Sequence, residues 1–530
     1  MQVNWKEVYK TQPAIPRQRI HYNEIEQWNW RNYRNYSPKE YIDLQSLQHP
    51  DNTHLLSQGT TNEEITDIVK KLKIKATGSS GIGTEVLKKL PPNIINIFKQ
   101  LYNASIATGY FPKFFKSARC IMIPKPGKNH ELPLSYRPIS LLEHTGKIFE
   151  KIINTRLRLH LEENSLLSNQ QFGFRPHKST SDPINIISEF IDAHSSRGRK
   201  IGIISKDVEK AFDTVWHNGL KFKFQHFQLP DITQTLLTSF LTNRNIKINF
   251  RDKHSSGFTP AAGVPQGSTL SPTLYNMYVN DMPRYNNDFE LTLQYADDVT
   301  ILTASRSKPG IIRVLQRMVN SINIFEEKWR IKTNPTKCQL LTTKTTNNDQ
   351  IKIYSSDLPT AVPIPRYNEI KILGVTFDSR AAYHKQTDKM TNLAKQTINL
   401  LKRFYPADTK TKLHLYKALV RPILDYAPGP SLISAATNQL KAQRIQNRAL
   451  KWALDHHWSE FTTAHSWHVE ADMLPLNIRR ASLLQNQLEK LEDNETHQRL
   501  RRLHRNNHNN GCHHCIFQLQ EGPPLDPIFT

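Results

Sequence analysis

The segment Leu291-Thr-Leu-Gln-Tyr-Ala-Asp-Asp-Val-Thr-Ile-Leu302 sets two adjacent acids, Asp297 and Asp298, between two short runs of apolar and β-branched residues. This pattern predicts two strands, over residues 291–294 and 299–302, that meet at an acidic turn. Asp is common in turns because its side chain hydrogen-bonds to the local backbone, so the pair alone is a weak indication of a ligand site. A binding role requires a further acid that the fold brings to the same place.

A third acid, Asp207, directly follows the largely apolar run Lys200-Ile-Gly-Ile-Ile-Ser-Lys206. The run predicts a buried strand, so Asp207 is expected at a strand end. Magnesium takes oxygen ligands, binds through one or two carboxylates together with substrate phosphates, and in pairs ~3.5–4 Å apart serves phosphoryl transfer. A site for two Mg²⁺ ions, with Mn²⁺ as the alternative metal, is therefore predicted at Asp207, Asp297 and Asp298.

A turn rich in Gly and Pro lies between these acids in the sequence, over Gly263-Val-Pro-Gln-Gly-Ser-Thr-Leu-Ser-Pro-Thr-Leu-Tyr-Asn276. It opens an apolar stretch with helical spacing. Gly267 would allow a close backbone approach to a ligand, and Gln266 offers both a hydrogen-bond donor and an acceptor. The alternative interpretation is a plain helix start with a Pro-containing entry.

The order of these three segments resembles the palm of a reverse transcriptase, in particular that of a jockey-like non-LTR retrotransposon. Further matching segments occur in sequence order: Ile123-Pro-Lys-Pro-Gly-Lys128, Ser135-Tyr-Arg-Pro-Ile-Ser-Leu-Leu142, Gln171-Phe-Gly-Phe-Arg-Pro-His-Lys-Ser-Thr180, Trp329-Arg-Ile-Lys-Thr-Asn-Pro-Thr-Lys337, Ile372-Leu-Gly-Val375 and Leu415-Tyr-Lys-Ala-Leu-Val-Arg-Pro-Ile-Leu-Asp-Tyr426. The resemblance covers roughly residues 60 to 480. It implies an RNA-directed DNA polymerase with an α+β right-hand fold, in which fingers and a helical thumb flank a palm with an antiparallel sheet.

The resemblance also implies roles for individual residues. Asp207 and Asp297 would be the principal metal ligands, Asp298 a weaker one, and a primer 3′-hydroxyl would attack the α-phosphorus of a dNTP. Phe212, five positions after Asp207, would lie under the incoming sugar and exclude a 2′-hydroxyl, unless it is simply a core residue. The other residues expected to contact the dNTP are Lys125, Arg137, Gln266 and Lys337. Of these, Lys337 would supply a proton to the leaving pyrophosphate.

Charge restricts the class of partner. Lys and Arg number 71 against 47 acids, a net charge of +24. A surplus of that size requires an anionic partner or a strongly repulsive free state. An RNA template and a DNA primer would provide the anionic partner. No run approaches the ~20 apolar residues that cross a bilayer, so no membrane partner is expected. Four cysteines are too few for a disulfide scaffold, and the first residues hold no apolar signal core. We therefore expect a reducing location, the cytoplasm and nucleus.

The chain is expected to divide into an N-terminal extension (1–60), fingers and palm (61–380), a helical, basic, thumb-like region (381–460) and a His/Arg-rich tail (461–530). A basic row in the third region recurs at helical spacing, and its members are Lys441, Arg444, Arg448 and Lys451. An apolar stripe follows one position later: Ala442, Ile445, Ala449 and Trp452. A helix that packs this stripe inward would lay the basic row along a nucleic-acid backbone. A solvated face is the alternative.

Two features depart from the resemblance. Relatives carry an apolar residue before the first catalytic Asp, whereas this chain has Lys206, which should point away from the metals into a packed layer. It needs an acid or an exit to water, or this copy is weakened. The Gly511-Cys-His-His-Cys515 segment suggests zinc, with His504 or His508 as a further ligand, but its spacing fits no common finger.

Three interpretations follow. We expect a polymerase, either as a module or as a truncated copy, because about 60 residues before its first motifs cannot hold the endonuclease of related elements. The second interpretation is a catalytically inactive retroelement remnant that binds RNA. The third is an RNA-dependent RNA polymerase, which Phe212 argues against. The sequence does not determine the template, the target site or the oligomeric state.

Overall fold

The computed structural model describes residues 54–490, apart from 133–134, 251–252, 344–349, 355–360, 405 and 457–462, together with residue 498. Most of the predicted N-terminal extension lies outside these residues, and so does most of the tail beyond residue 490, including the zinc hypothesis at Cys512 and Cys515. Within the described residues, no helix is long and apolar enough to cross a membrane.

The chain forms two compact units that interleave in sequence. The first unit runs to residue 167 and includes residues 210–280, and the second comprises residues 168–209 and those from 281 onward. This partition leaves the predicted divisions at residues 60, 380 and 460 untested, and they stay predictions. Asp207, Asp297 and Asp298 all belong to the second unit.

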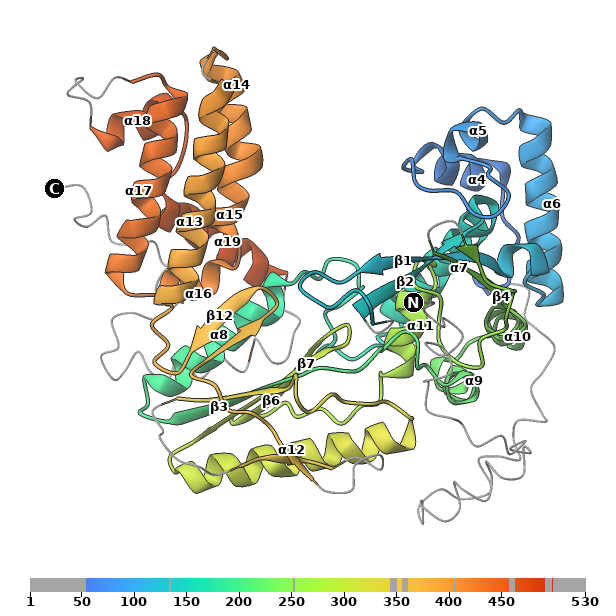
Figure 1. Cartoon of the computed structure of the whole chain (residues 1–530), viewed down its shortest axis with the longest axis horizontal. Coiled ribbons are helices and arrows are strands. Elements are labelled where there is room, and N and C mark those ends of the chain that lie inside the picture. The colour runs from blue at the N-terminus through green and yellow to red at the C-terminus, as the bar shows by residue number, and fades with distance from the viewer. Residues whose placement is uncertain are drawn as a thin grey trace. The chain divides into compact units, whose positions relative to one another are not determined.

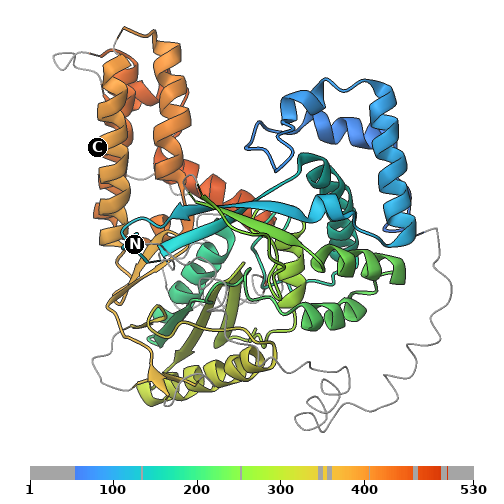
Figure 2. The same ribbon diagram turned by 45° about the vertical axis from the view of Figure 1, so that its right-hand side comes forward.

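The second unit is built on an antiparallel sheet, which we call the central sheet, with strand order β6-β7-β3-β8. Its strands are β6 (Glu290–Tyr295), β7 (Asp298–Ser305), β3 (Lys200–Lys206) and β8 (Gln339–Thr342). β6 and β7 form the predicted hairpin, with Tyr295 paired to Asp298 across the turn. The predicted buried strand is β3, which lies between β7 and β8. Figure 2 shows the same fold turned by 45° about the vertical axis.

One helix covers each face of the central sheet: α8 (Ser181–Ser195) packs on one side and α12 (Lys308–Lys328) on the other (Figure 1). Ile201 and Ile203 of β3 lie in the same buried cluster as α8. Gly202 faces α12 so closely that an added Cβ would lie 2.5 Å from Ile311 Cγ2. Because side chains alternate along a strand, Lys206 shares the α12 face with Gly202.

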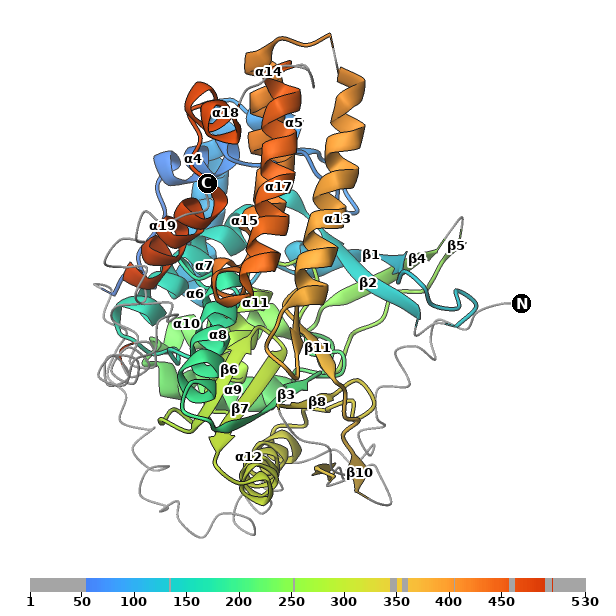
Figure 3. The ribbon, with the colours of Figure 1, turned by 90° about the vertical axis from the view of Figure 1, so that its left-hand side faces the viewer.

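The C-terminal part of the second unit is helical. Its main helices are α13 (His384–Leu401), α14 (Thr409–Leu415), α15 (Arg421–Asp425), α17 (Ala436–Ala453), α18 (Ala464–Glu470) and α19 (Leu476–Glu489). α13 and α17 run side by side (Figure 3). The predicted apolar stripe is confirmed, because Ala442, Ile445 and Ala449 are buried in the cluster that joins these helices.

The first unit surrounds a second sheet with helices. The strand order is β2-β1-β4-β5, from β2 (Tyr136–Leu142), β1 (Ser117–Pro124), β4 (Asn245–Phe250) and β5 (Lys253–His254). The helices are α4 (Asn62–Lys70), α5 (Thr84–Lys88), α6 (Pro92–Thr108), α7 (His144–Glu163), α9 (His217–Phe224), α10 (Asp231–Leu241) and α11 (Ser271–Tyr278). α11 begins inside the segment for which a helix start was predicted.

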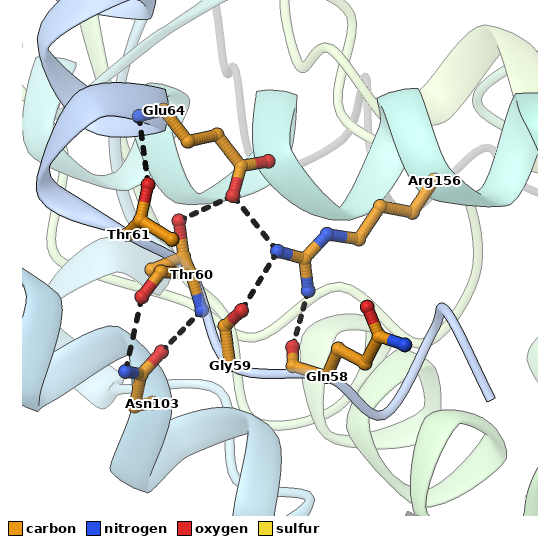
Figure 4. A network of polar contacts seen from close by, with 7 residues as sticks. All are labelled: Gln58, Gly59, Thr60, Thr61, Glu64, Asn103 and Arg156. Carbon is orange, nitrogen blue, oxygen red and sulfur yellow. Dashed lines mark hydrogen bonds and ion pairs between the residues drawn. The ribbon is translucent and has the colours of Figure 1, made fainter. Parts of the chain in front are cut away.

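Arg156 of α7 ties the start of the first unit together (Figure 4). Its Nη2 donates to Glu64 Oε2 of α4 at 2.8 Å and to the Gly59 carbonyl at 3.3 Å. Thr60 is held in turn by Asn103 of α6, whose Oδ1 accepts from the Thr60 N–H at 2.6 Å. The Arg156 side chain is only 9% exposed, so these charge-assisted contacts fix the chain leading into α4 against two other helices.

Candidate active site

The central sheet brings the three predicted metal ligands to one edge. Asp207 follows the last residue of β3, Asp297 occupies the turn between β6 and β7, and Asp298 is the first residue of β7. β3 and β7 are antiparallel neighbours with Lys206 opposite Val299, so the next step along each strand places Asp207 beside Asp298. The structure therefore gathers carboxylates that are about 90 residues apart in the sequence.

Repulsion among the carboxylates contributes to raised pKa values at Asp297 and Asp298. Desolvation, followed by repulsion from Asp207, raises the pKa of Asp297, and Lys337 opposes that shift. Desolvation, then repulsion from Asp297 and Asp207, raises the pKa of Asp298 to about 6. The Asp298 side chain is exposed at the end of β7, where Asp297 and Asp207 are its charged neighbours.

The donor set suits a hard cation, although the side chains are not gathered around one point. Carboxylate oxygens are the ligands that Mg²⁺ takes, and a cation would relieve the repulsion that raises these pKa values. In the described part of the chain, no three His, Cys, Asp or Glu side chains are disposed as a ready metal cluster. The assignment of Asp207, Asp297 and Asp298 as metal ligands thus stays a prediction that the chemistry of the edge supports.

Lys337 reaches the same edge. Its Nζ donates to Asp207 Oδ2 at 3.1 Å, and its side chain is 57% exposed. The turn that carries it is anchored beside the strand end, because the Asn334 N–H donates to the Asp207 carbonyl at 3.1 Å. The structure thus brings Lys337 to the acids, while its role toward pyrophosphate stays a prediction.

Lys206 finds an acid. Its side chain is fully buried and forms an ion pair with Glu326 near the end of α12. Of the outcomes that the sequence left open for Lys206, the structure selects the buried partner. No pattern in the sequence indicated Glu326, which is 120 residues away.

The aromatic and amide groups expected to contact the nucleotide lie in the first unit. Phe212 is half-buried and stacks on Tyr275 of α11, with ring centroids 5.1 Å apart and an interplanar angle of 26°. Gln266 Nε2 donates to Asp213 Oδ1 at 2.9 Å. At Gly267 the close approach is to the protein itself, since a Cβ there would lie 2.5 Å from the Ser140 carbonyl oxygen of β2. The close approach at Gly267 is thus packing of one turn on a strand, and an approach to a ligand stays a prediction.

The two predicted triphosphate ligands are carried by the β1–β2 connection and by β2. Lys125 follows β1 and is half-buried, and its N–H donates to the Ser135 carbonyl at 2.8 Å. Arg137 lies in β2 opposite Ile123, with an exposed side chain. Lys125 is close enough to Asp213 to favour ionisation of that acid. Lys125, Gln266 and Asp213 therefore share one region of the first unit.

Residues 123–377 match the family of reverse transcriptases, described as RNA-dependent DNA polymerases. This part of the chain is a reverse transcriptase domain. It contains every predicted metal ligand and nucleotide contact. The α+β right-hand fold class that the motifs implied is confirmed.

The curated relatives are polymerases of mobile elements. The chain is 31% identical to the probable RNA-directed DNA polymerase from transposon BS of Drosophila melanogaster, over 80% of this chain and 48% of that protein. It is 29% identical to the RNA-directed DNA polymerase from mobile element jockey of the same species, over 79% of this chain and 46% of that one. The chain thus spans about half the length of these relatives. The resemblance to jockey-like non-LTR elements is confirmed.

Among solved structures, the apo telomerase of Candida tropicalis is similar, with a TM-score of 0.39 and 12% identity over 78% of this chain and 74% of that one. A likeness at this level does not bear on function.

A clamp holds the turn that presents Asp297 in the reverse transcriptase domain. Gln171 Oε1 accepts from the Gly173 N–H at 2.9 Å and from the Ala296 N–H at 3.0 Å. Gln294 Nε2 donates to the Ala296 carbonyl at 2.8 Å. Ala296 has φ of +57°, a left-handed conformation that needs such support. Sequence reasoning used the Gln171–Gly173 segment only as a motif and missed this positioning role.

Asp213 is a second group that sequence reasoning missed. It borders a small cavity of about 30 Å³, together with Arg244 and Gln266. Desolvation raises the pKa of Asp213 to about 6, although the hydrogen bond from Gln266 and the charges of Lys210 and Lys125 act in the opposite direction. Asp213 could have been found from the sequence through its position directly after Phe212.

The basic row on α17 is not uniform. Lys441 is paired with Asp388 of α13, and Lys451 Nζ lies 5.4 Å from the centroid of the Trp467 ring. Arg444 and Arg448 are exposed. A cation committed to a neighbouring acid has less to offer a phosphate, so the two arginines are the better candidates for nucleic-acid contact. The role of all four residues stays a prediction.

Gly173→Ala should destabilise the second unit by roughly 1–3 kcal/mol, because overpacking forces the backbone to shift. The added Cβ would lie 2.1 Å from the Ala296 backbone nitrogen. Thermal unfolding of the purified proteins measures the loss. Gly83→Ala is the control, since a Cβ there meets only Thr77 Cγ2, at 3.8 Å. Equal unfolding temperatures for Gly173→Ala and the native protein would contradict the clamp.

Asp213→Asn should stabilise the protein at pH 8 and lose that advantage as the pH falls. Burial raises the folded-state pKa of Asp213 to about 6, above its ordinary value of 3.8. Asp213 therefore favours folding below the unfolded pKa, a contribution that is lost as the pH rises through 6. Asn keeps the acceptor for Gln266 and carries no charge. Unfolding temperatures of both proteins between pH 4 and 8 test this, and a difference independent of pH would refute it.

Proposed function

We propose that the chain is an RNA-directed DNA polymerase that adds dNTPs to a primer 3′-hydroxyl in retrotransposition. The observation that carries this proposal is the gathering of Asp207, Asp297 and Asp298 at one edge of the central sheet in a reverse transcriptase domain. Relatives over most of the chain are named RNA-directed DNA polymerases. The proposed partners are an RNA template, a DNA primer and dNTPs.

Phosphoryl transfer leaves little covalent work to the protein, so positioning and charge carry the reaction. Asp207 and Asp297 would hold two Mg²⁺ ions, or Mn²⁺ in their place, with Asp298 as a weaker ligand. Bound metal would supply Lewis acidity and neutralise charge on the phosphates. The clamp on Ala296 keeps Asp297 at the strand edge, and β3 does the same for Asp207.

Lysine and arginine side chains would bind the triphosphate and the leaving group. Arg137 is exposed and offers a planar fork of donors, and Lys125 adds a point charge. Lys337, held beside Asp207, would give its proton to pyrophosphate as that group leaves. The Lys337 ammonium lies 3.1 Å from the Asp207 carboxylate, so the donor would stand beside the proposed metal edge when the bond breaks.

Sugar selection is proposed to rest on Phe212. The ring is half-buried rather than fully enclosed, and stacking on Tyr275 fixes its plane. A rigid aromatic face leaves no room for a 2′-hydroxyl and offers it no hydrogen bond, which favours dNTPs over NTPs. Gln266 has its Nε2 committed to Asp213, so its Oε1 is the atom left to accept from a ligand.

The inactive-remnant interpretation loses one of the two features that favoured it, the other being the missing endonuclease. Lys206 has a buried acid as partner, so it is not an uncompensated charge in the packed layer. RNA binding without synthesis remains an outcome that primer extension distinguishes.

Asp207→Asn and Asp297→Asn should each lower primer extension on an RNA template by ~10²-fold or more, a loss expected when a charge that stabilises the transition state is removed. Folding and template binding should persist, because Asn has nearly the same volume. The assay measures dNTP incorporation with Mg²⁺. Asp472→Asn is the matched control, since Asp472 is exposed and has φ of +50°, which Asn tolerates. Undiminished primer extension by either variant would contradict the assignment of Asp207 and Asp297 as metal ligands.

Replacing Arg444 and Arg448 together with Gln should weaken template-primer binding about equally for all sequences. Each lost phosphate contact should flatten the slope of log affinity against log salt by ~0.7–0.9. Lys441→Gln should have a smaller effect, because Lys441 is already paired with Asp388. Titrations at several salt concentrations decide this. If the salt slopes of the native protein and of the variant that lacks both arginines are equal, the basic row is only a solvated face.

A further inference from the structure

A buried charge network lies directly behind the proposed metal edge. The Lys206 and Glu326 side chains are 0% and 7% exposed, and they pair across the interface of β3 with α12. Two buried charges lose much hydration, and removing one partner typically costs ~3–5 kcal/mol, whereas a well-packed apolar pair is often equally stable or better. Stability alone therefore does not explain why this chain carries a charged pair at Lys206.

Glu326 has a second partner in the turn that leads to Lys337. Thr333 Oγ1 donates to Glu326, at 2.8 Å from Oε1 and 2.9 Å from Oε2. Thr333 also forms an antiparallel bridge with Val208, and the Glu209 N–H donates to the Lys332 carbonyl at 2.7 Å. The Lys332–Thr333 segment thus runs alongside the residues that follow Asp207.

The contacts continue to the functional atoms. Asn334 N–H donates to the Asp207 carbonyl at 3.1 Å, and the Asn334 carbonyl accepts from the Lys337 N–H at 3.2 Å and from the Cys338 N–H at 3.3 Å. Asn334 Oδ1 accepts from Thr336 Oγ1 at 2.7 Å, which tightens the turn. At its end Lys337 Nζ donates to Asp207 Oδ2. An unbroken chain of contacts therefore joins Glu326 to the ammonium beside the acids.

We propose that Lys206, Glu326 and Thr333 form a positioning unit that sets the register of the Lys337 turn against Asp207. The proposal rests on the function proposed above and adds residues that the motifs did not assign. Glu326 satisfies Lys206 and Thr333 at once only when the ends of β3 and α12 and the turn are correctly placed. These three are positioning residues, since they act through Asp207 and Lys337.

Thr333→Val is the decisive variant, because it keeps the side-chain shape and leaves the Lys206–Glu326 pair intact. We expect kcat for primer extension to fall about tenfold, with template-primer affinity unchanged, since small misplacements near the reacting groups cost this much or more. The fall should largely vanish in a Lys337→Gln background, because groups that act through one another are not additive. Thr391→Val, which removes another buried Thr hydroxyl bond in the same unit, should leave kcat unchanged.

A pair replacement separates positioning from stability. Lys206→Met and Glu326→Gln should each lower the unfolding temperature, and Lys206→Met combined with Glu326→Leu should recover it. The double variant should not recover kcat, because Thr333 has lost its acceptor. Recovery of both unfolding temperature and kcat would overturn the proposal, and so would a Thr333→Val enzyme with native kcat.

Amide hydrogen exchange tests the network without any catalytic readout. Thr333→Val should speed exchange at Lys337 and Cys338, whose N–H groups bond to Asn334, while Thr391→Val should not. If the native protein extends no primer, the proposed function fails, and the exchange rates alone then decide whether the positioning unit exists. Unchanged exchange at both amides would overturn it.

Discussion

Antiparallel pairing of β3 with β7 is the constraint on which the second unit depends. With Lys206 opposite Val299, the ends of the two strands place Asp207 beside Asp298. A slip of one residue would turn every side chain of β3 to the other face of the sheet. It would bury Asp207 under α12 and remove Lys206 from Glu326. The apolar contacts of Ile201 and Ile203 with α8 on one face, and of Gly202 with α12 on the other, hold the register.

The acidic edge of the central sheet concentrates negative charge, and two lysines lie near it, one exposed and one buried. Lys337 is largely exposed and contacts Asp207 directly, and in the proposed reaction it would exchange that contact for a substrate phosphate. Lys206 is fully buried and committed to Glu326, so its role is confined to the packed layer. Desolvation, joined by repulsion among the carboxylates, raises the pKa values of Asp297 and Asp298, although Lys337 acts against the rise at Asp297. The remaining negative charge is what a divalent cation would bind.

In the first unit, hydrogen bonds and stacking limit the motion of the side chains that are proposed to contact the nucleotide. Phe212 is fixed by Tyr275, and Gln266 by Asp213 through its side chain and by Ser140 through its carbonyl. Side chains that are held before a ligand arrives lose little further entropy on binding. Arg444 and Arg448 on α17 are exposed by contrast. Exposed arginines suit contacts to backbone phosphates, which differ little from one nucleic-acid sequence to another.

The sequence by itself determined the local elements and the chemistry of the acidic edge. Runs of apolar and β-branched residues predicted the β6–β7 hairpin, a largely apolar run predicted β3, and helical spacing predicted the buried stripe of Ala442, Ile445 and Ala449. Motif order pointed to the reverse transcriptase family, which the comparisons confirmed. These features can be predicted from the sequence because periodicity and motif spacing are local properties of a chain.

Only the tertiary structure decided which side chains pair with one another. Lys206 pairs with Glu326, 120 residues away, and Lys441 pairs with Asp388, 53 residues away. The clamp of Gln171 on Ala296 spans 125 residues. A hydrophobic pattern indicates which face of an element is buried, but it does not specify which side chain of another element lies opposite. That choice depends on the register and packing of whole elements, and so it was settled only when the chain had folded.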